Sequence, residues 1–333
     1  MKAIRLHGEG DLRLSEESIP APTRDEVLIR VTAVGLCGSD LHWFNEGAIG
    51  DARLSRPLVL GHEFAGTTTD GARVAVDPAI PCEQCEFCRE GNPNLCTAMR
   101  FAGQDPQDGA LRDFIPWVTR CLYTLPDSLT DIDGAMLEPL GVALHAVDLG
   151  HIKSGMSIGI FGSGPIGLLI VQLARISGAT TIIATDPLTH RLDAARAFGA
   201  TKAICANGQE VGEILAITQG RGVDVAFEAA GADAAVEAAI AVAKPGARVV
   251  LVGIPADDHT TFTASAARRK GLTIKLSRRM KLTYPRAIQL AASGKIDLRS
   301  LVTHRFPLGE FQKAFNVAQK REGLKIVIEP AGG

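Results

Sequence analysis

The feature that most limits how this chain can fold is the regular alternation of short apolar runs and alanine-rich segments after residue 156. Buried strands are predicted in SIGIFG, TTIIATD, DVAFEAAG, ARVVLVG and TIKLS, and helices in GLLIVQLARISG and RLDAARAFGA between them. Strands that alternate with helices are typical of a parallel sheet that carries helices on both faces. We therefore predict a doubly wound α/β domain in this part of the chain.

A glycine-rich turn joins the first predicted strand to the first predicted helix. Its G-x-G-x-x-G pattern runs from Gly162 to Gly167, and Asp186 ends the next predicted strand nineteen residues later. Such a turn lets a pyrophosphate approach the helix N-terminus, where free N–H groups and the helix dipole favour negative charge. The pattern predicts a dinucleotide site made of Gly162, Gly164, Pro165, Ile166, Gly167, Asp186, Arg191, Gly253 and Ile254.

Asp186 indicates which dinucleotide is bound. A carboxylate at this position accepts hydrogen bonds from the ribose hydroxyls and repels a 2′-phosphate, which favours NAD over NADP. Arg191 lies five residues further on and would offset this preference by pairing with a 2′-phosphate. The alternative for Asp186 is a helix N-cap ahead of Pro187.

Four of the seven cysteines are concentrated in one short segment, Cys82, Cys85, Cys88 and Cys96, with the spacing C-x2-C-x2-C-x7-C. In a reducing cytoplasm, cysteines at this spacing are metal ligands rather than disulfide partners. Zinc is the predicted metal, and an iron–sulfur cluster is the alternative. Four protein ligands leave no coordination position for a substrate, so we expect this zinc to be structural.

A second set of ligand types lies upstream. Cys37 is followed twenty-five residues later by His62, with Glu63 beside it. Thiolate, imidazole and carboxylate are ligands of zinc ions that keep a fourth position for water or substrate. Taken singly, a buried core cysteine and a structural histidine are the commoner interpretations. Asp40 is predicted to orient the His62 ring by accepting its second N–H, with a turn residue as the alternative.

Composition excludes several classes of partner. The chain has 333 residues, a formal net charge of −2 and 46% hydrophobic residues, so neither nucleic acid nor a membrane surface is an expected partner. The N-terminus MKAIRLHGEGDLRL alternates like a strand and has no signal-peptide or presequence pattern, so a cytoplasmic location is expected. Glycines and Pro165 interrupt the long apolar run at 157–174, which argues against a membrane span.

Together these motifs resemble the zinc-dependent medium-chain dehydrogenases, and within them the sorbitol (L-iditol) and xylitol dehydrogenases. The resemblance covers nearly the whole chain and rests on the cysteine segment and on CGSDLHWFNEGAIGD, PLVLGHEFAG, MLEPLGVALHA, GSGPIG, RRMKLTYPRAI and SLVTHRFPL. It implies a GroES-like catalytic domain at 1–140 that contains the cysteine lobe 82–96. It also implies a Rossmann NAD-binding domain at 141–284 and a return to the catalytic domain at 285–333.

The resemblance further implies roles for single residues. The catalytic zinc ligands would be Cys37, His62 and Glu63, with Glu138 touching the metal directly or through water. Ser39 and His42 would form a proton relay, and Trp43, Glu138 and Arg279 would contact the substrate. The alternatives are an exposed helix-start glutamate for Glu138 and a solvated cation for Arg279. Cys121 and Cys205 match no functional position and are predicted to be buried thiols.

The implied activity is hydride transfer from a secondary alcohol to NAD, with a sorbitol-like or xylitol-like polyol giving its ketose and with two zinc ions per chain. A threonine dehydrogenase-like activity is the first alternative, although Arg279 and the HWFNEGAIG segment favour a polyol. A non-catalytic NAD-binding protein is the second. The resemblance also implies a homodimer or homotetramer built by pairing of edge strands, at 247–253 or at 273–277. A charged guard of basic residues at 268–279 would oppose such pairing.

Overall fold

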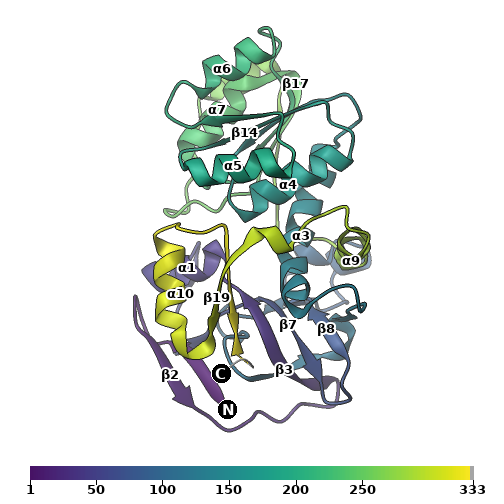
Figure 1. The fold of residues 1–333 in the computed structure, drawn as a ribbon, viewed down its shortest axis with the longest axis vertical. Coiled ribbons are helices and arrows are strands. Elements are labelled where there is room, and N and C mark those ends of the chain that lie inside the picture. Colours follow the sequence, from purple (N-terminus) through teal and green to yellow (C-terminus); the bar gives the residue numbers. More distant parts are fainter. Residues whose placement is uncertain (331–333) are drawn as a thin grey trace. The chain divides into compact units, whose positions relative to one another are not determined.

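The structure is a computed structural model that describes residues 1–330. The chain divides into two compact units (Figure 1). The first contains Met1–Pro139 and the chain from Tyr284 onward, and the second contains Leu140–Thr283. Each division falls one residue before the expected boundary.

The first unit is built around a mixed sheet to which the C-terminal part of the chain contributes. Its order is β12 (Leu122–Thr124), β8 (Arg73–Val76), β7 (Glu63–Thr68), β3 (Glu26–Gly35), β20 (Lys325–Glu329) and β19 (Val302–Pro307), and β11 (Phe114–Val118) also pairs with β3. The C-terminal segment KIVIE forms β20, which lies antiparallel to β3 with Val327 opposite Gly35. The central strand β3 therefore has β7 on one side and the C-terminal strand on the other.

Helices and short strands cover this sheet. The helices are α1 (Gly38–Glu46), α2 (Glu86–Arg89), α9 (Tyr284–Ala292), α10 (Phe311–Gln319) and, up to Pro139, the first part of α3 (Asp131–Gly150). The outer strands are β1 (Lys2–Leu6), β2 (Leu12–Glu16), β4 (Ala48–Ile49), β5 (Ala52–Arg53), β6 (Leu58–Val59), β9 (Ala79–Ile80) and β10 (Arg100–Phe101). A buried apolar cluster that includes Phe64, Trp117 and Phe315 forms the core. Among the helices of residues 1–330, none is both long and apolar enough to cross a membrane.

The second unit confirms the predicted doubly wound fold. Its strands are all parallel, in the order β15 (Lys202–Cys205), β14 (Thr181–Asp186), β13 (Ser157–Phe161), β16 (Val223–Glu228), β17 (Ala243–Leu251) and β18 (Thr273–Leu276). The connecting helices are α4 (Pro165–Ile176), α5 (Thr189–Phe198), α6 (Glu210–Ile217), α7 (Asp233–Val242) and α8 (Ala264–Lys270). Strand order reverses between β13 and β16, which is where such sheets bind dinucleotides.

Two expectations about this sheet are corrected. The segment 247–253 cannot be a free edge, because β17 pairs with β16 on one side and with β18 on the other. Within residues 1–330 the edge is β18, where the Leu276 side chain is 77% exposed. Cys205 is exposed at the end of β15, the opposite edge strand, whereas Cys121 is buried as predicted.

Candidate active site and metal centres

Local structure brings the three catalytic ligand types together. Cys37 is the extended N-cap residue of α1, two residues after the end of β3, and His62 and Glu63 lie where β7 begins. The β3–β7 register places Glu63 opposite Gly35, so the two segments meet at one end of the sheet. One ligand atom of each of the three residues lies within 4.8 Å of the others. This mixed donor set, on a group that leaves a further coordination position, fits a catalytic zinc ion.

Asp40 holds the two ligand-bearing segments. Its side chain is fully buried, with 0% exposure, and accepts the backbone N–H groups of Cys37 at 2.9 Å and Gly61 at 3.1 Å. One carboxylate oxygen lies 3.6 Å from His62 Nδ1, as expected of a residue that orients the ring. Burial alone would lower the pKa of His62, but the charges of Asp40 and Cys37 outweigh it and raise the pKa well above its ordinary value.

Lys325 is a site residue that the sequence did not reveal. It begins β20, is 2% exposed and forms an ion pair with Glu63 Oε2. Gly35 makes room for this pair, because a Cβ atom there would lie 2.2 Å from the carboxylate oxygen and 3.0 Å from Lys325 Cε. Burial alone would lower the pKa of this ammonium, but the charges of Glu63, Cys37 and Glu138 outweigh it and raise the pKa.

Glu138 lies close to this centre but outside the group of converging ligands. It is 4% exposed and sits well inside α3, which begins at Asp131, so the alternative of an exposed helix-start glutamate is wrong. Its charge reaches Lys325 and helps to raise the pKa of that ammonium. Direct ligation by Glu138 remains a prediction.

The predicted relay residues lie on α1. Ser39 and His42 are three positions apart, which places them on one face of the helix. His42 Nδ1 is 3.2 Å from Glu46 Oε1, one turn further on, so Glu46 is a ring-orienting partner that the sequence analysis missed. Trp43 is 2% exposed and belongs to the apolar core, and its predicted substrate contact stays a prediction.

The four-cysteine segment forms a second, closed cluster. One sulfur atom from each of Cys82, Cys85, Cys88 and Cys96 lies within 4.8 Å of the others. Cys82 donates its backbone N–H to Cys96 Sγ and Cys85 donates to Cys82 Sγ, both at 3.3 Å. Backbone N–H groups from Gln84 and Cys85 lower the pKa of Cys82 to about 6, which favours the thiolate that binds metal. Four converging sulfurs fit a structural zinc ion.

In the second unit, the glycine turn has the backbone that a dinucleotide site requires. Gly162 has φ 99°, and a Cβ atom on Gly167 would lie 1.9 Å from the Gly162 carbonyl oxygen. Gly164 caps α4, which begins at Pro165 and leaves its first N–H groups free for a phosphate. The predicted residues Gly253 and Ile254 follow β17, also at the carboxyl end of the sheet.

Backbone hydrogen bonds fix the Asp186 carboxylate beside the glycine turn. It accepts the backbone N–H groups of Ser163 and Leu188, each at 2.9 Å. The N-cap of α5 is Leu188, so the N-cap alternative for Asp186 is wrong. Arg191 Nη1 lies 3.6 Å from the Asp186 carboxylate, near enough for the arginine to influence the choice between NAD and NADP.

Arg279 is only half-buried but has an unusual backbone. Its φ of 55° lies in the left-handed region, where residues with a side chain are strained and tend to serve a function. This makes the simple alternative of a solvated surface cation less favourable. Its predicted substrate contact remains a prediction.

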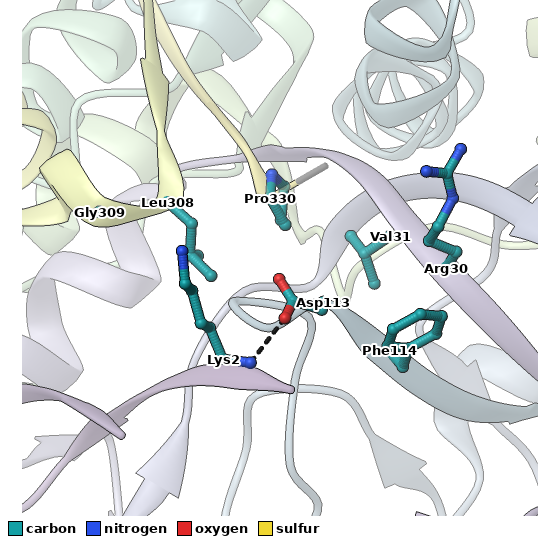
Figure 2. A pocket seen from close by; sticks show the side chains of 8 residues that line it. All are labelled: Lys2, Arg30, Val31, Asp113, Phe114, Leu308, Gly309 and Pro330. Atoms are coloured by element: carbon teal, nitrogen blue, oxygen red, sulfur yellow. Dashed lines mark hydrogen bonds between the residues drawn. The ribbon is translucent and has the colours of Figure 1, made fainter. Parts of the chain in front are cut away.

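Two surface pockets lie apart from these groups. One, of about 310 Å³, is shown in Figure 2; it is lined by Lys2, Arg30, Val31, Asp113, Phe114, Leu308, Gly309 and Pro330. The other, of about 230 Å³, lies in the second unit and is lined by Gly155, Ser157, Thr180, Thr181, Ile217, Thr218, Arg221 and Asp224. In the described part of the chain, neither pocket includes a predicted site residue.

Comparison with known proteins identifies the family. The model of the alcohol dehydrogenase GroES-like domain matches residues 23–127, and that of the zinc-binding dehydrogenase matches residues 165–293. The sorbitol dehydrogenase of Bacillus subtilis (strain 168) is 38% identical over 99% of this chain and 97% of its own length. The chain belongs to the zinc-dependent medium-chain dehydrogenase family.

Solved structures of several dehydrogenases share the fold. An Escherichia coli oxidoreductase of unknown specificity matches with a TM-score of 0.93 and 33% identity over 98% of both chains. An E. coli CFT073 protein described as a short chain alcohol dehydrogenase, complexed with NADH, has a TM-score of 0.90 and 28% identity, over 99% of both chains. A Sinorhizobium meliloti 1021 zinc-binding dehydrogenase bound to NADP has a TM-score of 0.91 and 31% identity, over 99% of both chains.

Membership in the zinc-dependent medium-chain dehydrogenases decides two open questions. The metal is zinc, so the iron–sulfur alternative for the cysteine cluster does not hold. The cofactor of the second unit is a nicotinamide dinucleotide, which similar solved structures contain as NADH or NADP. The preference of Asp186 for NAD over NADP stays a prediction.

Proposed function

We propose that this dehydrogenase oxidises a secondary alcohol group of a polyol, of the sorbitol or xylitol class, to the ketose with NAD as hydride acceptor. The observation that carries the proposal is the converging group Cys37, His62 and Glu63. A further buried acid, Glu138, lies close to it. The sorbitol dehydrogenase relative, which spans the whole chain, supports the same substrate class.

The residues of α1 would handle the hydroxyl proton. A zinc ion at the ligand group would act as a Lewis acid that lowers the pKa of the alcohol hydroxyl, and NAD would accept the hydride from its carbon. Ser39 would take the hydroxyl proton and His42 would pass it to solvent. Glu46 at Nδ1 holds the His42 ring so that its other nitrogen remains available for this exchange.

Polar residues around the substrate would give selectivity for a polyol. A hydroxyl group that is buried without a partner costs about 1–3 kcal/mol, so each substrate hydroxyl needs an acceptor or donor. Glu138 is proposed to accept one of them, and Arg279 to donate to another. Trp43 is proposed as the apolar contact. These three assignments rest on the family resemblance and on the burial of Glu138 and the strained backbone of Arg279.

A panel of alcohols tests the proposal. Sorbitol, xylitol, simple secondary alcohols and threonine would each be assayed for NADH or NADPH formation, with the expected result that polyols and NAD give the highest kcat/KM. Preference for threonine would support the amino-alcohol alternative. Zinc-loaded protein that binds NADH but oxidises none of the compounds would support a non-catalytic protein. Cys37→Ser should abolish turnover, and Cys205→Ser, at an exposed thiol, is the matched control.

We also propose that the protein assembles as a homodimer or homotetramer by pairing β18 with a second copy. The support is an edge strand whose Leu276 is exposed, since symmetric pairing removes an unpaired edge. Leu276→Lys should weaken the assembly. Light scattering of the wild type at micromolar concentration should give two or four times the chain mass of 35.2 kDa, and a monomer would contradict the proposal.

A further inference from the structure

We propose that Glu228 is a positioning residue that holds the turns which receive the nicotinamide half of the cofactor. Glu228 is the last residue of β16 and its side chain is 1% exposed. One carboxylate oxygen accepts the backbone N–H groups of Ala230 at 2.7 Å and Gly231 at 2.6 Å. The carboxylate therefore fixes the turn that leaves its own strand.

The turn after β17 packs against the same carboxylate. A Cβ atom on Gly253 would lie 2.8 Å from Glu228 Oε2 and 2.2 Å from the Gly231 nitrogen. A Cβ atom on Gly231 would lie 2.4 Å from the Ile254 carbonyl oxygen. The backbone N–H of Val252 donates to the Glu228 carbonyl oxygen at 2.8 Å. The turns 229–231 and 252–254 thus have no space between them, and their shared contact is Glu228.

The position of these turns indicates what they bind. Glu228 is level with Phe161 of β13 and with Leu251 of β17, so its carboxylate lies at the carboxyl end of the sheet. A dinucleotide binds across this end, one nucleotide on each half of the sheet. Asp186 on β14 is the ribose-reading acid of the first half. The half that contains β16 and β17 is therefore the one that faces the nicotinamide nucleotide.

The glycine turn of the first half is fixed separately. The Ser163 N–H donates to Asp186 at 2.9 Å, and this contact does not involve Glu228. The two turn systems also pack against each other, because a Cβ atom on Gly162 would lie 2.8 Å from the Ala230 nitrogen and 2.9 Å from the Ala229 carbonyl carbon. Loss of the Glu228 carboxylate should therefore displace the nicotinamide side and leave the adenine side largely in place.

Burying a carboxylate costs free energy because the charged group loses its hydration. Burial raises the pKa of Glu228, and the backbone N–H groups that it accepts act in the opposite direction. A neutral amide of the same shape offers one acceptor oxygen instead of two and adds donor hydrogens where the turns already supply donors. Glu228→Gln should therefore loosen both turns with little change in volume.

Two ligands of different length test this assignment without any turnover. ADP fills only the adenine side, whereas NADH also fills the nicotinamide side. Glu228→Gln should weaken NADH binding about tenfold, the order expected from losing one charge-assisted hydrogen bond, and ADP binding less than about threefold. Calorimetric titration of both ligands into purified protein measures the two ratios. Glu213→Gln, an exposed acid on α6, is the matched control and should leave both affinities unchanged.

Equal weakening of NADH and ADP would overturn the assignment, because a merely structural role moves both affinities together. Unchanged binding of both ligands would overturn it as well. Gly253→Ala provides a second route to the same turns, since its added Cβ meets the Gly231 nitrogen at 2.2 Å. If Glu228→Gln fails to fold, selective loss of NADH affinity in Gly253→Ala supports the assignment, and equal loss of both ligands refutes it.

Discussion

Replacing Lys325 by methionine should destabilise the first unit strongly in metal-free protein. Methionine keeps the apolar stem of the side chain but removes the ammonium that pairs with Glu63. Both partners are buried, at 2% and 1% exposure, so the carboxylate left behind has no access to water. Removing one partner of a buried ion pair costs about 3–5 kcal/mol. The same estimate corresponds to a fall in the melting temperature on the order of 10 °C.

A double variant separates charge from packing. The double variant Glu63→Gln and Lys325→Met removes both charges of the pair. No unpaired buried charge is left, so most of the lost stability should return. A zinc ion held by the predicted ligands Cys37, His62 and Glu63 would supply a positive charge beside the Glu63 carboxylate, so the effect of Lys325→Met should be smaller in zinc-loaded protein.

Urea denaturation followed by tryptophan fluorescence is the suitable assay. Both tryptophans of the sequence, Trp43 and Trp117, belong to the core of the first unit, so the signal reports unfolding of that unit. An unchanged urea midpoint for Lys325→Met would refute the reasoning. Equal destabilisation of the single and double variants would show that lost packing, rather than the unpaired charge, is the cause.

Three further results are expected. Cys82→Ser should lower the zinc content from two ions per chain to one and destabilise the protein, whereas Cys205→Ser should do neither; metal analysis and thermal melts decide. Asp186→Ala should lower the ratio of kcat/KM with NAD to kcat/KM with NADP about tenfold, and an unchanged ratio would show that other residues set the preference. Burial alone would raise the pKa of Asp224, but hydrogen bonds from Arg221 and Lys244 outweigh it and hold the pKa well below its usual range. The contribution of Asp224 to folding stability should therefore be fully present above about pH 4 and be lost as the pH drops further. Asp224→Asn should flatten that part of a plot of unfolding free energy against pH.

Features that depend on neighbours in sequence were predictable. The glycine turn at 162–167 and the cysteine segment at 82–96 depend on short sequence spacings. As expected, the turn precedes the start of α4 and the four sulfur atoms converge. The strands of the second unit were visible because each is a separate apolar run between helices.

Features that depend on distant strand pairing were not predictable. Lys325 reads as a polar residue at a strand end, and only its pairing beside β3 brings it to Glu63. The ARVVLVG segment appeared free to act as an edge because its sequence does not reveal that β18 pairs outside it. Glu228 likewise ends an apolar strand, and its partners come from two separate turns.

The insertion of β20 beside β3 has a consequence for biosynthesis. Residues 140–283 form a continuous segment, so the second unit can fold on the ribosome as soon as that segment has emerged. The sheet of the first unit must wait for β19 and β20, which are translated last. A chain that stops before Lys325 would leave the ribosome with a finished nucleotide-binding unit and with Glu63 lacking its counter-charge. Such truncated products should be recognisable to cellular proteases by their incomplete first unit, whatever the state of the second.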